Sequence, residues 1–331
     1  MVSERGVSYY GVYDARKASK DFTGLLDDGV NAVLLAMSEF DFRFWKTGIE
    51  GVLKEARDRD RGLSVYIDLW GWGKAFGGEP GSIFVQKNPG ELQVSRSGST
   101  IAAACVNSAF RQIVTDSLKE ICEDMEFDGV FLDEPHYGHV EDGWGCFCEK
   151  CKSLFRDKYG RDMDMDMTED VFEFREESML EFLSDAVDVV KAAGKQVIVC
   201  MLPFEGEKRR LAGAPEWDKI CALDIDVLAT DPYWMTFDEP LEPFVTRHVR
   251  NLLKACGKTG KRAQVWVQLF NVPEGREREI VKGIELIKKV EVEGKTVDSI
   301  FGWPYLAGKR SILASDNPDL VWKNFLTTLR S

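Results

Sequence analysis

The chain has 331 residues, of which 44% are hydrophobic and 11% aromatic, so it can bury a large core; this length is common for α/β barrels. A formal net charge of −13 argues against nucleic acids and anionic membranes as partners, and no apolar run reaches the about 18 residues of a membrane-spanning helix. Because the N-terminal residues lack a signal-peptide pattern, we expect a cytoplasmic protein whose eight cysteines are thiols or metal ligands rather than disulfides.

Strand-like and helix-like runs alternate along the chain. Eight strands alternating with helices are typical of a (β/α)8 TIM barrel, predicted here as a single domain over residues 1–331. A Gly-, Ser- and Pro-rich stretch at 74–100 is expected to be a long loop. The predicted strands span residues 7–13, 32–37, 63–69, 129–132, 196–201, 225–229, 264–269 and 299–302; the predicted helices span residues 18–28, 44–59, 107–126, 179–193, 243–256, 277–290 and 318–329.

A doubly wound sheet is the alternative architecture for this alternation, but no Gly-rich phosphate-binding loop follows an early strand. Polar and aromatic residues instead collect just after the strands, and in a barrel these positions face one mouth, where barrel enzymes build their sites. Three other aspartates, Asp14, Asp41 and Asp128, are interpreted as structural groups that cap helices or bind loop amides.

The fourth predicted strand is the centre of the predicted site. Its apolar run ends in Asp133 and Glu134, and Pro135 cannot continue a central strand. A neighbouring like charge raises the pKa of a carboxyl group, so Glu134 is predicted to be the general acid. Asp133 is either a further catalytic acid or a group that orients its neighbour.

A C-x-C-x-x-C run, Cys146, Cys148 and Cys151, lies in a loop insertion predicted at about 135–175. Three thiolates at this spacing can converge on one ion, and zinc needs a fourth ligand. Cys105 is the preferred fourth ligand because it precedes the helix leading into the fourth strand; His136 and His139 are the alternatives. A closed set of four ligands predicts a structural zinc beside the acids.

The segment Cys105-Val106-Asn107-Ser108-Ala109-Phe110-Arg111, the acid pair and the three-cysteine run together resemble the zinc-bearing part of family 42 β-galactosidases, which are clan A TIM-barrel glycoside hydrolases. The resemblance covers about residues 100–160. It implies a zinc bound by the four cysteines, and Glu134 as the acid/base residue. Clan A enzymes place a glutamate nucleophile at the end of the seventh strand, where this chain has Gln268.

Glycoside hydrolysis generally needs two carboxyl groups, one to protonate the leaving oxygen and one to attack the sugar or activate water. Because Gln268 can do neither, the second carboxylate must come from another strand. Asp231 is the preferred candidate, since it follows the sixth strand and Pro232 stiffens the turn that presents it. Asp68 and Glu205, at the ends of the third and fifth strands, are the weaker candidates.

Aromatic side chains past the strand ends support a carbohydrate ligand, because the apolar faces of sugar rings stack on aromatic planes while their hydroxyls need polar partners. The predicted substrate-binding residues are Asp68, Trp70, Trp72, His136, Tyr137, Tyr233, Trp234, Gln268 and Trp303.

The sequence therefore predicts a glycoside hydrolase that acts on an oligosaccharide or glycoside, with Glu134 as general acid/base and Asp231 as second carboxylate. A barrel that binds carbohydrate without cleaving it is the alternative. The expected partner is a carbohydrate, with no nucleic acid and no membrane, and a homo-oligomer is left open.

Overall fold

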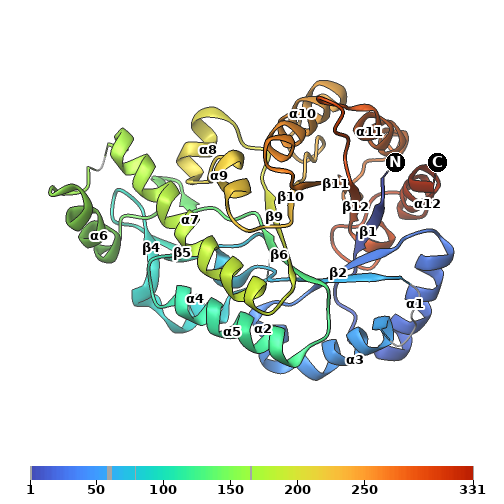
Figure 1. Ribbon diagram of the computed structural model, residues 1–331, viewed down its shortest axis with the longest axis horizontal. Helices are drawn as coiled ribbons and strands as arrows, with labels where there is room; N and C mark the ends of the chain where they lie inside the picture. Colours follow the sequence, from blue (N-terminus) through green and yellow to red (C-terminus); the bar gives the residue numbers. More distant parts are fainter. Residues whose placement is uncertain (1, 58–61, 79, 165, 331) are drawn as a thin grey trace.

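The computed structural model describes residues 2–57, 62–78, 80–164 and 166–330. Eight parallel strands close into a barrel in the order β1-β12-β11-β10-β9-β6-β3-β2, with helices around it (Figure 1). The predicted (β/α)8 barrel is thereby confirmed. The barrel strands are β1 (Glu4–Ser8), β2 (Ala32–Ala36), β3 (Ser64–Asp68), β6 (Gly129–Asp133), β9 (Gln196–Met201), β10 (Val227–Thr230), β11 (Arg262–Gln268) and β12 (Ser299–Trp303).

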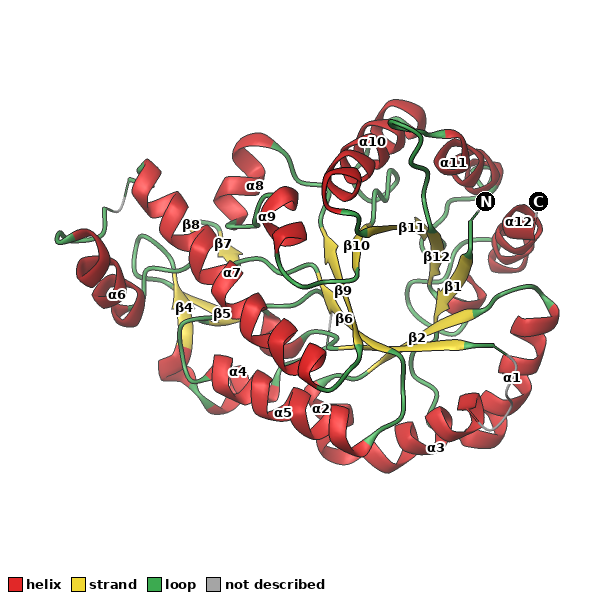
Figure 2. Cartoon of the chain, viewed as in Figure 1, coloured by secondary structure: helices red, strands yellow, loops and turns green. Residues whose placement is uncertain are grey.

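Helices follow the strands and cover the outside of the barrel (Figure 2). In the described residues, no helix is long and apolar enough to cross a membrane. The helices are α1 (Ala15–Asp27), α2 (Glu39–Phe44), α3 (Lys46–Arg57), α4 (Ile83–Lys87), α5 (Phe110–Asp124), α6 (Glu149–Tyr159), α7 (Glu169–Ala192), α8 (Gly206–Ala212), α9 (Trp217–Ala222), α10 (Leu241–Thr259), α11 (Arg278–Lys289) and α12 (Pro318–Arg330).

Four predicted elements differ clearly from the structure. The helix predicted at 179–193 begins ten residues earlier, at Glu169. The first strand ends at Ser8 rather than at residue 13, because the chain turns away there into the loop before α1. The helix predicted at 44–59 is two helices that meet at Trp45; its predicted end, residue 59, lies outside the described residues. The stretch at 74–100 is not a plain loop, since it holds α4 and one strand of a hairpin, β4 (Leu92–Val94) paired with β5 (Thr100–Ala104).

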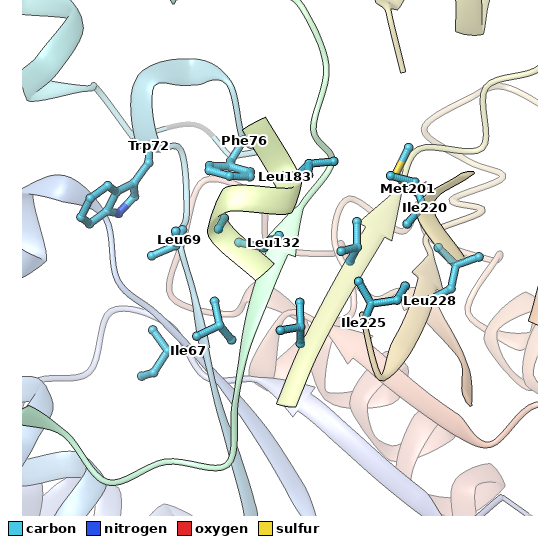
Figure 3. Packing of buried hydrophobic residues seen from close by; sticks show 14 of the residues in the cluster. Ile67, Leu69, Trp72, Phe76, Leu132, Leu183, Met201, Ile220, Ile225 and Leu228 are labelled. Atoms are coloured by element: carbon cyan, nitrogen blue, oxygen red, sulfur yellow. The ribbon is translucent and has the colours of Figure 1, made fainter. Parts of the chain in front are cut away.

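Two apolar layers follow from the alternation of side chains along each strand. One set fills the inside of the barrel, including Leu34, Tyr66, Phe131 and Trp266. The other set packs under the helices, and Figure 3 shows part of it, including Leu132 of β6 and Leu183 of α7. Burying an aliphatic or aromatic side chain fully is worth about 1.5–3 kcal/mol, so both layers stabilise the closed barrel.

A buried acid is satisfied at the N-terminal end of the barrel. The Tyr66 hydroxyl donates to Glu4 Oε1 at 2.6 Å, and the Ser299 hydroxyl donates to Glu4 Oε2 at 3.0 Å. Buried polar groups are tolerated when they are hydrogen-bonded in this way. Glu4 therefore joins β1, β3 and β12 at the end opposite the predicted site.

The three aspartates predicted to be structural have that role. Asp14 accepts hydrogen bonds from the first amides of α1, at 2.8 and 3.1 Å. Asp41 forms a capping box with Ser38 at the start of α2. Asp128 accepts from Val65 N at 2.7 Å, which ties the start of β6 to β3. Each side chain satisfies backbone donors that would otherwise lack a partner.

The chain leaves the barrel between β6 and α7 and forms a small hairpin, β7 (His139–Val140) with β8 (Gly143–Trp144), followed by α6. This segment and the β4–β5 hairpin lie side by side at the left of Figure 2, beyond the barrel strands. Buried Gln93 joins them, because its amide accepts from Gly138 N at 2.9 Å and donates to Ala104 O at 2.9 Å.

Candidate active site and metal centre

Three of the predicted acids stand at the C-terminal mouth of the barrel. Asp68 ends β3, Asp133 ends β6 and Asp231 directly follows β10. They continue the inward-facing series that includes Tyr66, Phe131 and Ala229, because side chains two residues apart share a face of a strand. The alternation of the barrel strands thus directs these three carboxyl groups toward the mouth.

Glu134 belongs to the opposite face by this alternation, but its backbone leaves the strand. Its φ of 41° lies in the left-handed region, which is uncommon for a residue with a side chain. Its N–H still donates to Cys200 O at 2.9 Å, so the residue stays attached to β9. The turn brings the Glu134 carboxyl group to the same place as that of Asp133.

Gly77, in the loop after β3, lies next to both carboxyl groups. A Cβ added there would lie 2.6 Å from Asp133 Oδ2 and 2.7 Å from Glu134 Oε2. The Gly77 N–H donates to Asp133 O at 2.8 Å, which holds the loop against the end of β6. Only glycine leaves room for both carboxyl groups at this position.

Replacing Gly77 by Ala is therefore expected to displace both carboxyl groups and, if they are catalytic, to lower kcat by about 10-fold or more, since small misplacements of catalytic groups are costly. The melting temperature should change little, because both groups can move toward the open mouth. Gly81→Ala is the matched control: its Cβ would have an ordinary contact, 3.4 Å from Gln86 Nε2. Equal activity of the two variants would contradict the role of Gly77.

The electrostatics of the site centre on Glu134. Burial raises the pKa of Asp231 well above its usual range, and the charge of Glu134 and a hydrogen bond with it raise it further. Burial also raises the pKa of Asp133, with further contributions from Glu134 and then Asp68. Burial raises the pKa of Asp68 to about 8, and the charge of Glu134 adds to this. Burial, with a smaller contribution from the neighbouring carboxyl groups, therefore favours the protonated forms of Asp68, Asp133 and Asp231.

Asp68 is fully buried and bound on one side. The Tyr10 hydroxyl donates to its Oδ2 at 2.5 Å, while its Oδ1 finds no partner among the described residues. The same holds for Oδ1 of Asp231, which is 3% exposed. Buried oxygens without partners are rare, and a ligand hydroxyl at the mouth is a group that could satisfy them.

The raised pKa of Asp68 predicts a pH effect on stability. A carboxyl group with a folded pKa of about 8 and an unfolded pKa of about 3.9 binds its proton more strongly in the folded state. Its contribution to stability is complete below the unfolded pKa and is lost as the pH rises from about 4 to about 8. Asp68→Asn should therefore lose less melting temperature than the wild type between pH 5 and pH 8. An equal loss of melting temperature in Asp68→Asn and in the wild type between pH 5 and pH 8 would contradict this prediction.

Four predicted substrate-binding residues, Trp72, Tyr137, Trp234 and Gln268, are buried and hydrogen-bonded within the protein. The Trp72 Nε1 group donates to Met37 O at 2.6 Å, and the ring lies within the packed cluster of Figure 3. Tyr137 is fully buried against α7. Trp234 donates to Glu279 Oε2 at 2.8 Å. Gln268, 1% exposed, accepts from Thr236 and donates to Phe270 O.

The remaining aromatic residues do line the mouth. Trp70, Tyr233 and Trp303 are partly exposed. Tyr10, which the sequence did not single out, lies between two of them, with ring centroids 5.0 Å from Trp70 and 6.4 Å from Trp303. Its position between a strand end and a helix was the available signal, but the predicted first strand extended past it.

Two further candidates, His136 and Glu205, are not part of the cluster of acidic side chains at the mouth. His136 is half-buried and its Nδ1 lies 2.5 Å from the carbonyl oxygen of Glu134, so it holds the backbone of that turn. Glu205 accepts from Asn251 Nδ2 at 2.8 Å and pairs with Arg247, so it is tied to α10.

The four predicted cysteines come together. The Sγ atoms of Cys105, Cys146, Cys148 and Cys151 all lie within 4.8 Å of one another, and Cys105 Sγ is 3.4 Å from Cys151 Sγ and 3.6 Å from Cys148 Sγ. All four are free thiols. Four sulfurs at about 2.3 Å from one ion would be about 3.8 Å apart, so the cluster fits a tetrahedral metal such as zinc. His139 is not part of it: the residue is exposed and stacks on Trp144.

Two segments bring these thiols together. The N–H of Cys105, which follows β5, donates to Glu91 O at 2.9 Å, and the N–H of Phe147 donates to Val94 O at 2.7 Å. Cys148 directly precedes α6, and Cys151 lies in its first turn. The hairpin β4–β5 therefore fixes one ligand and receives the segment that carries the other three.

The structure is thus a closed parallel barrel with acidic and aromatic residues at its C-terminal mouth. No protein-family model and no curated protein sequence matches the chain. Its fold resembles that of α-L-fucosidase isoenzyme 2 from Paenibacillus thiaminolyticus, with a TM-score of 0.61 and 13% identity over 99% of this chain and 49% of that one. It also resembles the endo-β-1,4-mannanase from Thermotoga petrophila, with a TM-score of 0.59 and 11% identity over 100% of this chain and 78% of that one. The chain thus spans about half the length of the fucosidase, and it shares a (β/α)8 barrel fold with both enzymes.

Proposed function

We propose that the protein is a glycoside hydrolase whose catalytic pair is Glu134 and Asp231. The observation that carries the proposal is the placement of these two residues, Glu134 directly after β6 and Asp231 directly after β10, where the Glu134 carboxyl group contributes to the raised pKa of Asp231. Glycoside hydrolysis generally requires two carboxyl groups that lie in different environments.

The electrostatics favour one division of roles within this pair. The pKa of Asp231 is raised by burial and by Glu134, so Asp231 carries a proton that it can donate to the leaving oxygen. Glu134 then takes the second role, attack on the anomeric carbon or activation of water. The sequence suggested the reverse, with the proton on Glu134. A carboxyl separation of about 5–5.5 Å would imply the retaining route, and one of about 6.5–9.5 Å the inverting route.

The site also favours neutral sugars over anionic ones. Asp68, Asp133 and Asp231 are kept protonated by burial and by the charge of Glu134. Among the described residues, none of these acids forms an ion pair with Lys or Arg. A sugar carboxylate or sulfate would add a second negative charge in the same place, whereas uncharged hydroxyls can bind Oδ1 of Asp68 and the aromatic rings.

The test is a panel of 4-nitrophenyl glycosides. Because the similar structures are a fucosidase and a mannanase, the panel should include α-fucoside and β-mannoside beside gluco- and galactosides of both anomers, with a glucuronide as the anionic control. We expect turnover of at least one neutral glycoside and none of the glucuronide. Binding of a neutral sugar without turnover of any glycoside would instead support a carbohydrate-binding barrel.

A further inference from the structure

Arg175 of α7 is a buried charge without an acidic partner. Its side chain is 0% exposed, and no ion pair in the described part of the chain includes it. Its guanidinium donates to three backbone carbonyls instead: to Gly145 O from Nε at 2.8 Å, to Arg210 O from Nη1 at 3.1 Å and to Leu211 O from Nη2 at 2.7 Å. Neutral acceptors satisfy its hydrogen bonds but leave its charge uncompensated, which is costly in a protein interior.

The negative charge that Arg175 lacks is available in the cysteine cluster. Gly145, which accepts two of its hydrogen bonds, directly precedes Cys146. Four neutral thiols offer no counter-charge, whereas four thiolates around a divalent ion carry a net charge of −2.

We propose that Arg175 is the charge-compensating residue of the four-cysteine metal centre: its buried guanidinium stabilises the four-thiolate form and thereby sets the affinity for zinc. Asn107 assists, because its Nδ2 group lies 3.4 Å from Cys151 Sγ as an N–H···S donor. Groups that surround metal ligands in this manner commonly change metal affinity by about 10- to 100-fold. The proposal does not depend on the glycosidase activity.

The metal in turn holds Arg175, and Arg175 joins three segments. It connects the cysteine loop at Gly145 to the end of α8 at Arg210 and Leu211. Its guanidinium lies 4.7 Å from the centre of the Tyr137 ring, a cation–π contact. Tyr137 follows Glu134 by three residues, and its N–H donates to Ala212 O at 2.8 Å. Loss of the metal should therefore loosen the segment that follows Glu134.

Two substitutions separate charge from shape. Arg175→Gln removes the charge but keeps donors, and Arg175→Lys keeps the charge but loses the planar fork. We expect zinc affinity, measured by competition with a chromophoric chelator, to fall by about 10- to 100-fold in Arg175→Gln and clearly less in Arg175→Lys. Arg156→Gln on α6, where the side chain is 59% exposed, is the control and should bind zinc like the wild type. Equal affinity of Arg175→Gln and wild type would overturn the proposal, as would equal losses in both Arg175 variants.

A measurement on the wild type covers the case in which the variants do not fold. Hydrogen exchange of the zinc-loaded and the chelated protein should differ at the Tyr137 amide and in residues 210–214, which Arg175 and its partners hold. The expected result is faster exchange there after chelation, with β10 and β11 unchanged as an internal reference. Unchanged exchange at Tyr137 and in residues 210–214 would overturn the coupling between the metal centre and Arg175.

Discussion

Glu134→Gln is expected to lower kcat by roughly 10²-fold or more for every glycoside that the wild type hydrolyses, because an amide cannot take the proposed role of attacking the sugar or activating water. The fold should be retained, since the amide has the same shape. The variant should also lower the pKa of Asp231, because the charge of Glu134 contributes to its rise. Steady-state kinetics over a pH range measure both effects. Glu141→Gln, an exposed acid in the same segment, is the control.

Asp231→Asn distinguishes the two roles within the pair. If Asp231 donates the proton, its loss should slow glycosides with poor leaving groups by roughly 10²-fold or more and affect dinitrophenyl glycosides far less, because these need no protonation. Glu134→Gln should slow both substrates alike. The opposite pattern, with Glu134→Gln sensitive to the leaving group, would restore the assignment first made from the sequence. Full activity of both variants would exclude this pair.

Removal of the metal is expected to have the largest effect on stability. The purified protein should contain about one zinc per chain, and Cys146→Ser or chelation should lower the melting temperature by roughly 5 °C or more, because metal binding contributes directly to folding. Cys146 is fully buried in the segment between β6 and α7. Elemental analysis and thermal unfolding with and without chelator provide the measurements.

Cys122→Ser is the matched control for this experiment. Cys122 is a buried thiol of α5 that lies outside the four-cysteine cluster. The substitution should retain the zinc and cost only what a buried hydroxyl costs. Purified protein without zinc or iron, or a melting temperature that is the same with and without the chelator, would contradict a structural metal.

The sequence was informative where the chemistry depends on local pattern. The period of two along β3 and β6 directs Asp68 and Asp133 toward the barrel mouth, and the spacing of Cys146, Cys148 and Cys151 brings three thiols together whatever surrounds them. Strand ends were less certain: the apolar character of the sequence after Ser8 carried the first predicted strand past Tyr10, a residue of the mouth.

Features that depend on tertiary contact could not be predicted. The left-handed φ of Glu134 and its meeting with Gly77 arise from the packing of one loop on another strand end. Trp72 and Trp234 follow strands as sugar-stacking residues do, but their indole N–H groups find acceptors in the interior and the rings are covered. An aromatic residue after a strand is compatible with either outcome until its neighbours are known.

The two excursions from the barrel have a consequence for how this fold can be altered. One, between β3 and α5, supplies Cys105, and the other, between β6 and α7, supplies the remaining cysteines; Gln93 of the first also holds Gly138 of the second. Each excursion therefore depends on the other for part of its buried contacts. In evolution or in engineering, the pair is therefore a single unit of exchange, and a chimera that transplants either excursion alone leaves an incomplete set of ligands on both sides of the graft.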